Sequence, residues 1–518
     1  MRRLFEFFVE SLPGLHARRS ALTALFLCAC CLCAAVPLAA QCPDGSMPPC
    51  DRRPLLPARS VAVLTFDNGS RDTSAQYFAE GLADQISTRL GGVARLTMIS
   101  RSAVRRLRNP EQQSIQQIGR ALNAAYLLSG SIRAAGGRVR VNVEAVRAAT
   151  GEAVWSEAYD RASDDLIGLE ESIATEVAAG VAGRLSPQER RALGSRLTAS
   201  SRAYEQFLRG NVLLARRSAG ALRDAIVAYQ AATAADSGFA DAYARLAYAY
   251  SLIVNWSPGS RSETDSLLSL SRQASTRALR LGPRSSEGWM GRAYLLTQWS
   301  AFVRLDSDDS LLASLAAFRR ALELNPRNDE AWHQYGSTLR YVNDSASLDA
   351  MRHALALDPA RAVTYLDLSW TYFLMGRTDR ALATVDSAVA LDPDGPFHTL
   401  RVLVRLTAGD TAGAVADARL MPGFRFNQAV LAVFAHDSAA VRAMEARVAQ
   451  PGCDPVSATY LLWTGRREQA VQRILVCGPS LNTRWALRDP IYAPLADDPR
   501  IQALRAESER ILARARWR

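Results

Sequence analysis

Hydrophobic and polar residues follow two different rhythms along this chain, and the change comes near residue 200. From Ser60 onward, short apolar runs suited to buried strands alternate with amphipathic stretches suited to helices. Strict alternation of apolar and polar residues over 138–144, after Gly136 and Gly137, indicates a half-buried antiparallel strand. We therefore expect an α/β domain with a small mixed sheet over 60–185. Its predicted strands and helices cover 61–66, 75–90, 96–99, 114–122, 125–132, 138–144, 153–159 and 164–185.

Helical periodicity replaces the strand patterns over 201–500. Pro326, Pro359 and Pro393 each follow a helical segment, and they are spaced by 33 and 34 residues. This is the tetratricopeptide (TPR) period, in which two antiparallel helices form a unit and a proline ends the second helix. The match is clearest over 329–395, where aromatic residues and alanines recur at positions that pack neighbouring helices. We expect an all-α TPR solenoid, followed by a last helix over 501–518.

An apolar stretch without charges covers 21–40, and basic residues precede it at Arg2, Arg3, Arg18 and Arg19. This layout is typical of an export signal. The first 40 residues are therefore either a signal peptide or an uncleaved membrane anchor whose basic end stays in the cytoplasm. Either reading predicts a protein of the periplasm or cell envelope, with the C-terminal part outside the cytoplasm if the inner-membrane anchor is kept.

The residues around position 40 favour cleavage. Pro37 and the small residues Ala39 and Ala40 resemble a signal-peptide cleavage site. A lipoprotein would use Cys42, but Gln41 stands before it where a small residue is expected.

Cysteine usage agrees with export. Residues 41–59 form a proline-rich linker that contains Cys42 and Cys50, and the other cysteines beyond the apolar segment are Cys453 and Cys477. These four lack the short spacings of a zinc site, which favours disulfides in an oxidising compartment. Three pairings are possible, and the local pairs Cys42 with Cys50 and Cys453 with Cys477 are the simplest.

All 62 basic residues are arginine, and the net charge is +11. A phosphate-loop NTPase, a protein kinase and a pyridoxal-phosphate enzyme each require a lysine, so the sequence excludes these classes. The arginines are spread over the whole length, which indicates solvated helix faces and no nucleic-acid partner. An acidic partner would suit such faces.

Signatures of the common enzyme classes are absent from the sequence. No G-x-S-x-G, H-E-x-x-H or G-x-G-x-x-G motif is present. The five histidines have no nucleophile or carboxylate partner in a triad-like context. We therefore predict a protein that is not an enzyme, with no catalytic residue, no metal and no cofactor.

The first helix of each repeat should line the concave surface of the solenoid, where TPR proteins bind a protein or peptide. In the two clearest units we expect this surface to contain Glu330, His333, Ser337, Arg340, Val363, Leu366, Trp370 and Phe373.

The α/β region resembles a known family. The run Ser60–Leu64 with Phe66, the run Tyr77–Leu82, and Gly130 with Ser131 are similar to the TolB-like amino-terminal domain. The resemblance covers about 60–185 and implies an architecture in which related chains carry a kinase, a winged-helix domain or a nucleotide cyclase before this domain. Only about twenty residues separate the apolar segment from Ser60 here, so the resemblance implies the sensing or scaffolding half alone.

These observations lead to two main hypotheses. The first is a non-catalytic exported or membrane-tethered scaffold that binds a protein or peptide partner through the TPR concave surface. The alternative is the sensory half of a signalling system that acts with a separate kinase or transcription regulator. An envelope enzyme is a third and weaker hypothesis, and the oligomeric state stays open.

Overall fold

The computed structural model describes residues 57–70, 74–107, 109–162, 165–256, 260–302, 308–479 and 481–516. The predicted export segment, Cys42 and Cys50 lie outside these residues. In the part of the chain that is described, no helix is both long and apolar enough to cross a membrane.

A mixed sheet forms within residues 60–162. Its order is β3-β1-β4-β5-β6, and β2 pairs with β4 outside this path. β1 runs parallel to β3 and β4, whereas β4, β5 and β6 form two antiparallel hairpins. Val139, Val141 and Val143 of β5 are buried between exposed polar neighbours, which confirms the predicted half-buried strand. The strands are β1 (Ser60–Val63), β2 (Asp67–Asn68), β3 (Thr97–Met98), β4 (Tyr126–Ala135), β5 (Arg138–Arg147) and β6 (Ala153–Ala162).

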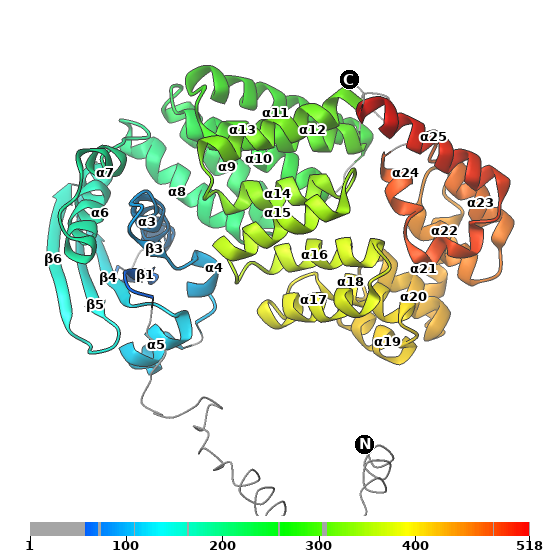
Figure 1. Cartoon of the computed structure of the whole chain (residues 1–518), viewed down its shortest axis with the longest axis horizontal. Helices are drawn as coiled ribbons and strands as arrows, with labels where there is room; N and C mark the ends of the chain where they lie inside the picture. Colours follow the sequence, from blue (N-terminus) through cyan, green and yellow to red (C-terminus); the bar gives the residue numbers. More distant parts are fainter. Residues whose placement is uncertain are drawn as a thin grey trace, which may run out of the picture. The chain divides into compact units, whose positions relative to one another are not determined.

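Helices α3 and α6 pack against the sheet and against each other (Figure 1). The sequence pattern predicts α3, α5 and α6, but it misses α4 and α7, which are too short to show a period. Local caps hold both: Ser100 accepts the backbone N–H of Ala103 in α4, and Ser186 forms a capping box with Glu189 in α7. The helices of this part are α3 (Ser74–Gly91), α4 (Arg101–Val104), η1 (Pro110–Gln112), α5 (Ile115–Leu122), α6 (Leu166–Ala182) and α7 (Pro187–Leu193).

Paired helices follow from residue 201 onward, and each pair packs against the next. Pro326, Pro359 and Pro393 each lie two residues beyond the end of a second helix, which confirms the predicted punctuation. The helices are α8 (Ser201–Ala215), α9 (Ala219–Ala235), α10 (Ala240–Trp256), α11 (Arg261–Leu281), α12 (Ser286–Phe302), α13 (Asp308–Leu324), α14 (Asp329–Leu339), α15 (Asp344–Leu357), α16 (Ala362–Leu374), α17 (Thr378–Leu391), α18 (His398–Thr407), α19 (Thr411–Leu420), α20 (Arg425–Phe434), α21 (Ser438–Val448), α22 (Pro455–Trp463), α23 (Arg467–Leu475), α24 (Leu481–Ala486), η2 (Pro490–Leu495) and α25 (Pro499–Arg516).

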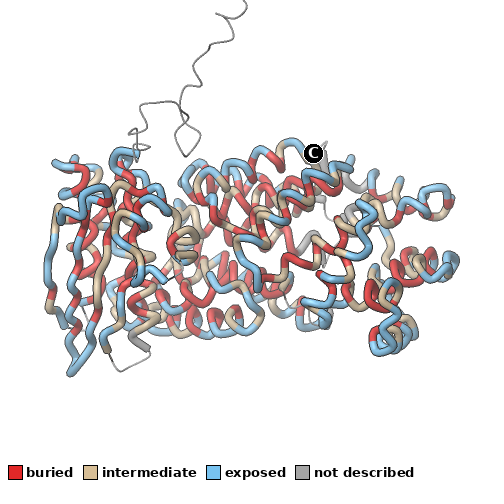
Figure 2. Tube along the Cα trace, turned by 90° about the horizontal axis from the view of Figure 1, so that it is seen from below, coloured by how far each residue is buried: buried red, intermediate tan, exposed pale blue. Residues whose placement is uncertain are grey.

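One hydrophobic core joins the sheet to the first repeats. The cluster runs without a break from Val61 in β1 to Ala331 in α14, and Figure 2 shows buried positions in both the sheet and the paired helices. α3 packs closely on α8, where Gly81 faces Leu208. The change near residue 200 is therefore a change of secondary structure and not a gap in packing. Beyond α14 the core divides into smaller clusters.

The end of the chain returns to the middle of the repeats. α25 packs against α13. Arg484 of α24 donates to the carbonyl of Tyr341 at 2.9 Å, and Arg488 donates to the carbonyl of Arg340 at 3.3 Å. Arg488 also pairs with Asp344 at the start of α15. The C-terminal helices thus contact two separate parts of the helical array.

A disulfide joins Cys453, in the turn before α22, to Cys477, after α23, with Cα atoms 4.6 Å apart. Replacing both cysteines by alanine should lower the free energy of unfolding by about 2 to 3 kcal/mol, because the disulfide limits the freedom of the unfolded loop. Thermal melting and hydrogen exchange over α21–α23 would measure this loss. A reductant should destabilise the wild type and leave the double variant unchanged; equal melting of the two proteins would contradict the expectation.

Candidate functional site

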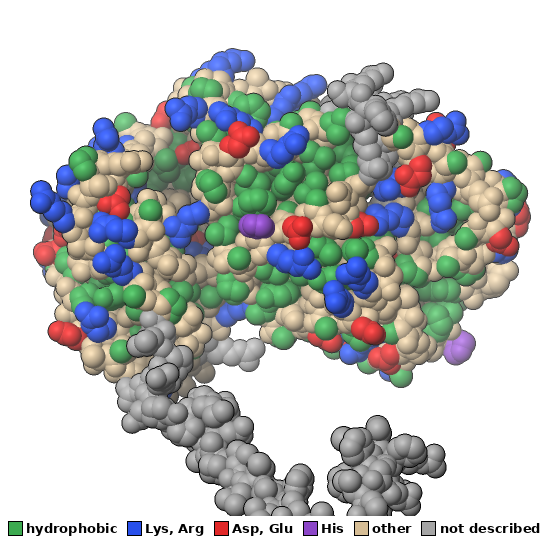
Figure 3. All heavy atoms as spheres, viewed as in Figure 1, with side chains coloured by type: hydrophobic (Ala, Val, Ile, Leu, Met, Phe, Trp, Pro, Cys, Tyr) green, Lys and Arg blue, Asp and Glu red, His purple; other side chains and the backbone are tan. Residues whose placement is uncertain are grey.

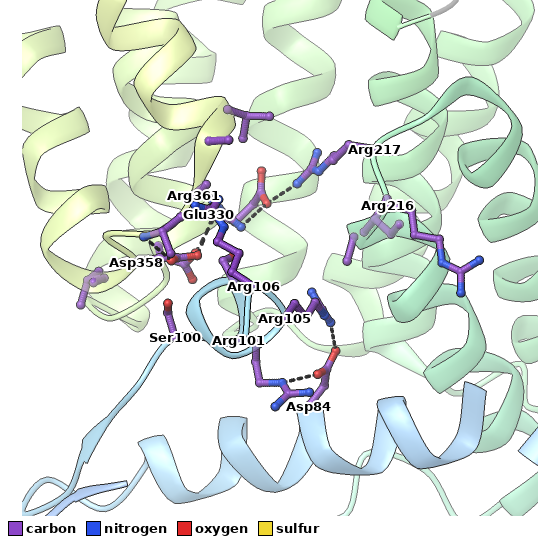
Figure 4. Close-up of a pocket in the computed structure, with 18 of the residues that line it drawn as sticks. Asp84, Ser100, Arg101, Arg105, Arg106, Arg216, Arg217, Glu330, Asp358 and Arg361 are labelled. Atoms are coloured by element: carbon purple, nitrogen blue, oxygen red, sulfur yellow. Dashed lines mark hydrogen bonds and ion pairs between the residues drawn. The ribbon is translucent and has the colours of Figure 1, made fainter. Parts of the chain in front are cut away.

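A cavity of about 1230 Å³ opens between the α/β part of the chain and the repeats. The second half of α3 and the segment from β3 through α4 form one wall. The opposite wall comes from the turn between α8 and α9 and from the starts of α12, α14 and α16. Figure 4 shows arginine and carboxylate side chains from both walls around this opening. The cavity therefore exists only where the two parts of the chain meet.

Charged groups on the α/β wall hold α4 against α3. Asp84 of α3 forms ion pairs with Arg101 and Arg105. Arg101 also donates to the carbonyl of Val63 at the end of β1. Because one carboxylate serves two guanidinium groups, this cluster keeps a positive charge.

Arg106 follows this cluster and reaches across to the repeats. Its Nη2 group donates to the carbonyl of Ala360, in the turn between α15 and α16. Its Nη1 group is buried and has no hydrogen-bond partner among the residues that the structure describes. Burial lowers the pKa of Arg106, and the charges of Asp358 and Asp392 oppose that change. Arg106 is thus a desolvated cation that, among these residues, is fixed by a neutral carbonyl and by no carboxylate.

The repeat wall is held by a buried carboxylate between two arginines. Glu330 of α14 pairs with Arg217, from the turn after α8, and lies 3.0 Å from Arg361, the residue before α16. Tyr248 of α10 donates its hydroxyl to the same carboxylate. Burial alone would raise the pKa of Glu330, but Arg217 and Arg361 hold that pKa well below its usual range. The network ties four helical pairs, those that begin with α8, α10, α14 and α16, together beside the cavity.

Three arginines of the lining have no carboxylate within 4.0 Å in the described ranges: Arg106, Arg216 and Arg327. Arg216 is exposed, and its guanidinium lies 5.2 Å from the ring centre of Tyr77. Arg327 donates to the carbonyl of Gly91 at 3.1 Å. Each of these cations can meet an anionic group without first losing an ion pair.

The lining offers groups for binding. Of the described residues that form it, none is a cysteine or a histidine. Within the same described ranges, no three His, Cys, Asp or Glu side chains are placed to hold a metal ion. What remains is a set of guanidinium, carboxylate, hydroxyl and amide groups that can recognise a charged or peptide-like ligand.

The structure brings two of the eight predicted concave residues, Glu330 and Val363, to the cavity wall. Glu330 is itself only 6% exposed, and His333, Arg340 and Phe373 are buried outside the lining, with exposed fractions of 3%, 7% and 0%. This corrects the expectation that these four side chains face an open surface.

Contacts between neighbouring repeats explain two of these burials. Asp367 of α16 lies 3.3 Å from Nε2 of His333 and 3.0 Å from Nη1 of Arg340. Nδ1 of His333 lies 2.8 Å from the hydroxyl of Thr364, also on α16. Side chains that a single repeat would expose are thus used to join one repeat to the next. Phe373 belongs to the apolar cluster between α16 and its neighbours.

The other three predicted residues, Ser337, Leu366 and Trp370, are half-buried and lie outside the cavity lining. Leu366 and Trp370 pack against the same apolar cluster as Ile491 of η2. The C-terminal segment therefore packs against the same apolar cluster as part of the surface that the sequence predicts to be open.

Sequence reasoning misses the arginines that shape the cavity, namely Arg101, Arg105, Arg106, Arg216, Arg217, Arg327 and Arg361. Most of them lie in turns or at helix ends, where no periodic pattern applies. Ser100 could have indicated the start of α4, because serine is a favoured residue at the N-cap of a helix. That signal gives no hint that α4 faces the repeats.

Protonation of His333 is expected only in acid. Burial lowers the pKa of His333 to about 4, and the charges of Asp367 and Glu330 only partly oppose this effect. Arg361 and Arg217 lower the pKa further. The unfolded chain protonates the same side chain near pH 6.5. The unfolded state thus binds more protons between these values, so the free energy of unfolding should fall as the pH drops from about 6.5 to 4.

Urea denaturation between pH 7 and pH 4 measures this dependence. His333→Gln should show a shallower decline in stability than the wild type, because glutamine does not titrate. The exposed His353 gives a matched variant, His353→Gln. If His333→Gln and the wild type declined equally, the assignment of the proton to His333 would be wrong.

Two family models match parts of this chain. Residues 57–176 match the second domain of HilA/YgeH-like transcriptional regulators. Residues 344–402 match the tetratricopeptide repeat, which confirms the TPR repeats predicted from the proline spacing. The first match covers the region of the predicted TolB-like domain and does not identify it as TolB-like.

Individual proteins match longer parts of the chain. "Putative adenylate cyclase 3" of Rhizobium meliloti (strain 1021) is 30% identical over 194 residues, which are 37% of this chain and 33% of that protein. The chain thus spans about a third of the length of this relative. A thermophilic TPR protein of Thermus thermophilus matches with a TM-score of 0.34 and 19% identity, over 39% of this chain and 99% of its own. The pilF protein of Pseudomonas aeruginosa matches with a TM-score of 0.31 and 16% identity, over 45% and 92%.

Proposed function

We propose that this chain is a non-catalytic scaffold, exported or membrane-tethered, that binds a protein or peptide partner in the cavity between its α/β domain and its TPR repeats. The observation that carries the proposal is that the two walls of the cavity combine fixed ion pairs with arginines that have no ion pair. Ion pairs within each wall fix the backbone, while Arg106, Arg216 and Arg327 remain without a carboxylate in the described ranges. A cavity with a fixed backbone and charged groups that form no ion pair is suited to binding a polar ligand.

Site-specific photo-crosslinking in intact cells tests this function. Val363 lines the cavity and is half-buried. A photoreactive residue at this position should yield a discrete product with another protein, which mass spectrometry would identify. Val227 on α9 is 63% exposed and lies outside the cavity lining, so it gives a matched control. No product from Val363, or the same products from both positions, would refute the proposed site.

A second candidate is the sensory half of a signalling system that acts with a separate kinase or regulator. The matches to a transcriptional regulator's second domain and to a protein named as an adenylate cyclase favour it, as does the resemblance of 60–185 to TolB-like domains. Mass spectrometry of soluble and membrane fractions tests this second candidate. A mature N-terminus at Gln41 in soluble periplasm counts against it, whereas residues 1–40 retained in the membrane favour it over a free scaffold.

A further inference from the structure

The cavity lining contains paired charges and unpaired ones. In the described ranges the unpaired groups are three arginines and, at the edge, the carboxylates of Asp392 and Asp394. Asp84 is committed to Arg101 and Arg105, and Glu330 to Arg217 and Arg361. The described cations without a carboxylate are distributed over three sides: Arg106 at the end of α4, Arg216 after α8 and Arg327 before α14. A ligand therefore meets positive charge from both walls of the cavity.

Among these three arginines, Arg106 has a buried nitrogen, Nη1, without a hydrogen-bond acceptor in the described part of the chain. A buried guanidinium nitrogen without an acceptor loses the hydrogen bonds that water would supply. A planar guanidinium is suited to a carboxylate, which can accept from two nitrogens at once. The Arg106 side chain is half-buried and lines the cavity, so a ligand carboxylate beside it would neutralise its charge.

The nearby carboxylates of the described chain do not fill this role. Asp358 and Asp392 act on Arg106 through space, and neither forms an ion pair with it. Asp358 is instead directed at Arg361, 3.8 Å away. Asp392 and Asp394 are exposed at the edge of the lining, where they limit how many negative charges a ligand can bring.

We infer that this composite cavity binds an acidic peptide segment, with one ligand carboxylate on Arg106 and a second near Arg216. The inference rests on the proposed function and names the class of partner. The position of the site matters as well as its charge. On the face shown in Figure 3, arginines are scattered among acidic and apolar side chains and form no single patch, so the charge of that face would not direct an acidic segment to one place on it. The cavity does so because its free cations converge from two walls.

Fluorescence anisotropy on the full-length protein in detergent tests the inference. The probes are three short labelled peptides, in which serine alternates with glutamate, with glutamine or with arginine. We expect the glutamate peptide to bind about tenfold more tightly than the glutamine peptide and to weaken as salt is added. Equal binding of the glutamate and glutamine peptides, or tighter binding of the arginine peptide, would overturn the inference.

Variants locate the binding. Arg106→Gln removes the charge and should weaken the binding of the glutamate peptide about tenfold. Arg106→Lys keeps the charge but loses the planar guanidinium, so it should recover only part of the affinity. Arg320→Ala is the matched control, because Arg320 pairs with Glu323 on α13 away from the cavity. Circular dichroism of each variant checks its folding. Unchanged binding by a folded Arg106→Gln would also overturn the inference. Crosslinking from Val363 combined with no preference for glutamate would leave the proposed function standing and remove this inference alone.

Discussion

Glu330→Ala is expected to lower the free energy of unfolding by about 3 to 5 kcal/mol, the cost of breaking a buried ion pair by removing one partner. The carboxylate is 6% exposed and holds Arg217 and Arg361 together. Without this carboxylate, the guanidinium groups of Arg217 and Arg361 would repel each other, and each would lose one hydrogen-bond acceptor. The loss should appear in urea denaturation followed by circular dichroism, with hydrogen exchange rising first at α14 and α16.

A surface pair gives the control for this result. Glu323 on α13 is largely exposed and pairs with Arg320 at 2.9 Å. Glu323→Ala should change stability by less than about 1 kcal/mol, because water screens an exposed ion pair. Similar losses in the two variants would show that burial of the Glu330 network contributes little.

Gly81→Leu is expected to destabilise the protein by about 3 kcal/mol, the upper part of the range for overpacking. A Cβ atom at this position would lie 2.8 Å from Cβ of Leu208 and 3.5 Å from its Cα. These atoms belong to the body of α8 and cannot swing away as a flexible side chain could. α3 and α8 would have to separate, which would also widen the cavity between the α/β domain and the repeats.

Chemical denaturation measures the stability of this variant, and crosslinking from Val363 reports on the cavity. Gly220→Ala in the first turn of α9 is the matched control, because a Cβ atom there would meet nothing within 4 Å. That substitution should be neutral or slightly stabilising, since alanine favours helix more than glycine does. A Gly81→Leu protein as stable as the wild type would mean that α3 and α8 are not tightly packed.

The sequence predicts those elements of the fold whose pattern lies within their own residues. Alternating valines predict β5 because burial repeats every second residue in a strand, and the proline spacing predicts the repeats because each proline stops one helix. β2 and α4 escape prediction because two and four residues are too few to show a period. Their positions depend on partners elsewhere: β2 pairs with β4, and α4 is held by Asp84 of α3.

The candidate site is harder to predict for the same reason. Residues near 100, 217, 330 and 361 line one cavity only after the α/β domain has packed on the repeats. TPR geometry alone predicts that His333 and Arg340 face a groove, and it does not foresee that Asp367 of the next repeat binds both. The same geometry predicts Glu330 and Val363 as partner contacts on the concave surface, and they lie in the cavity because they stand at helix starts beside the domain.

The shared core between the sheet and the first repeats has a consequence for modularity. Separation of the two parts near residue 195 would uncover Leu208 of α8, which is fully buried and lies against Gly81 of α3. The domain and these repeats cannot then be exchanged between proteins as separate cassettes. The repeats beyond α14 have apolar clusters of their own. Arg361 and Asp367 from the α16 region nevertheless pair with Glu330, His333 and Arg340 from the α14 region, so an exchange of these repeats would have to preserve these polar contacts as well.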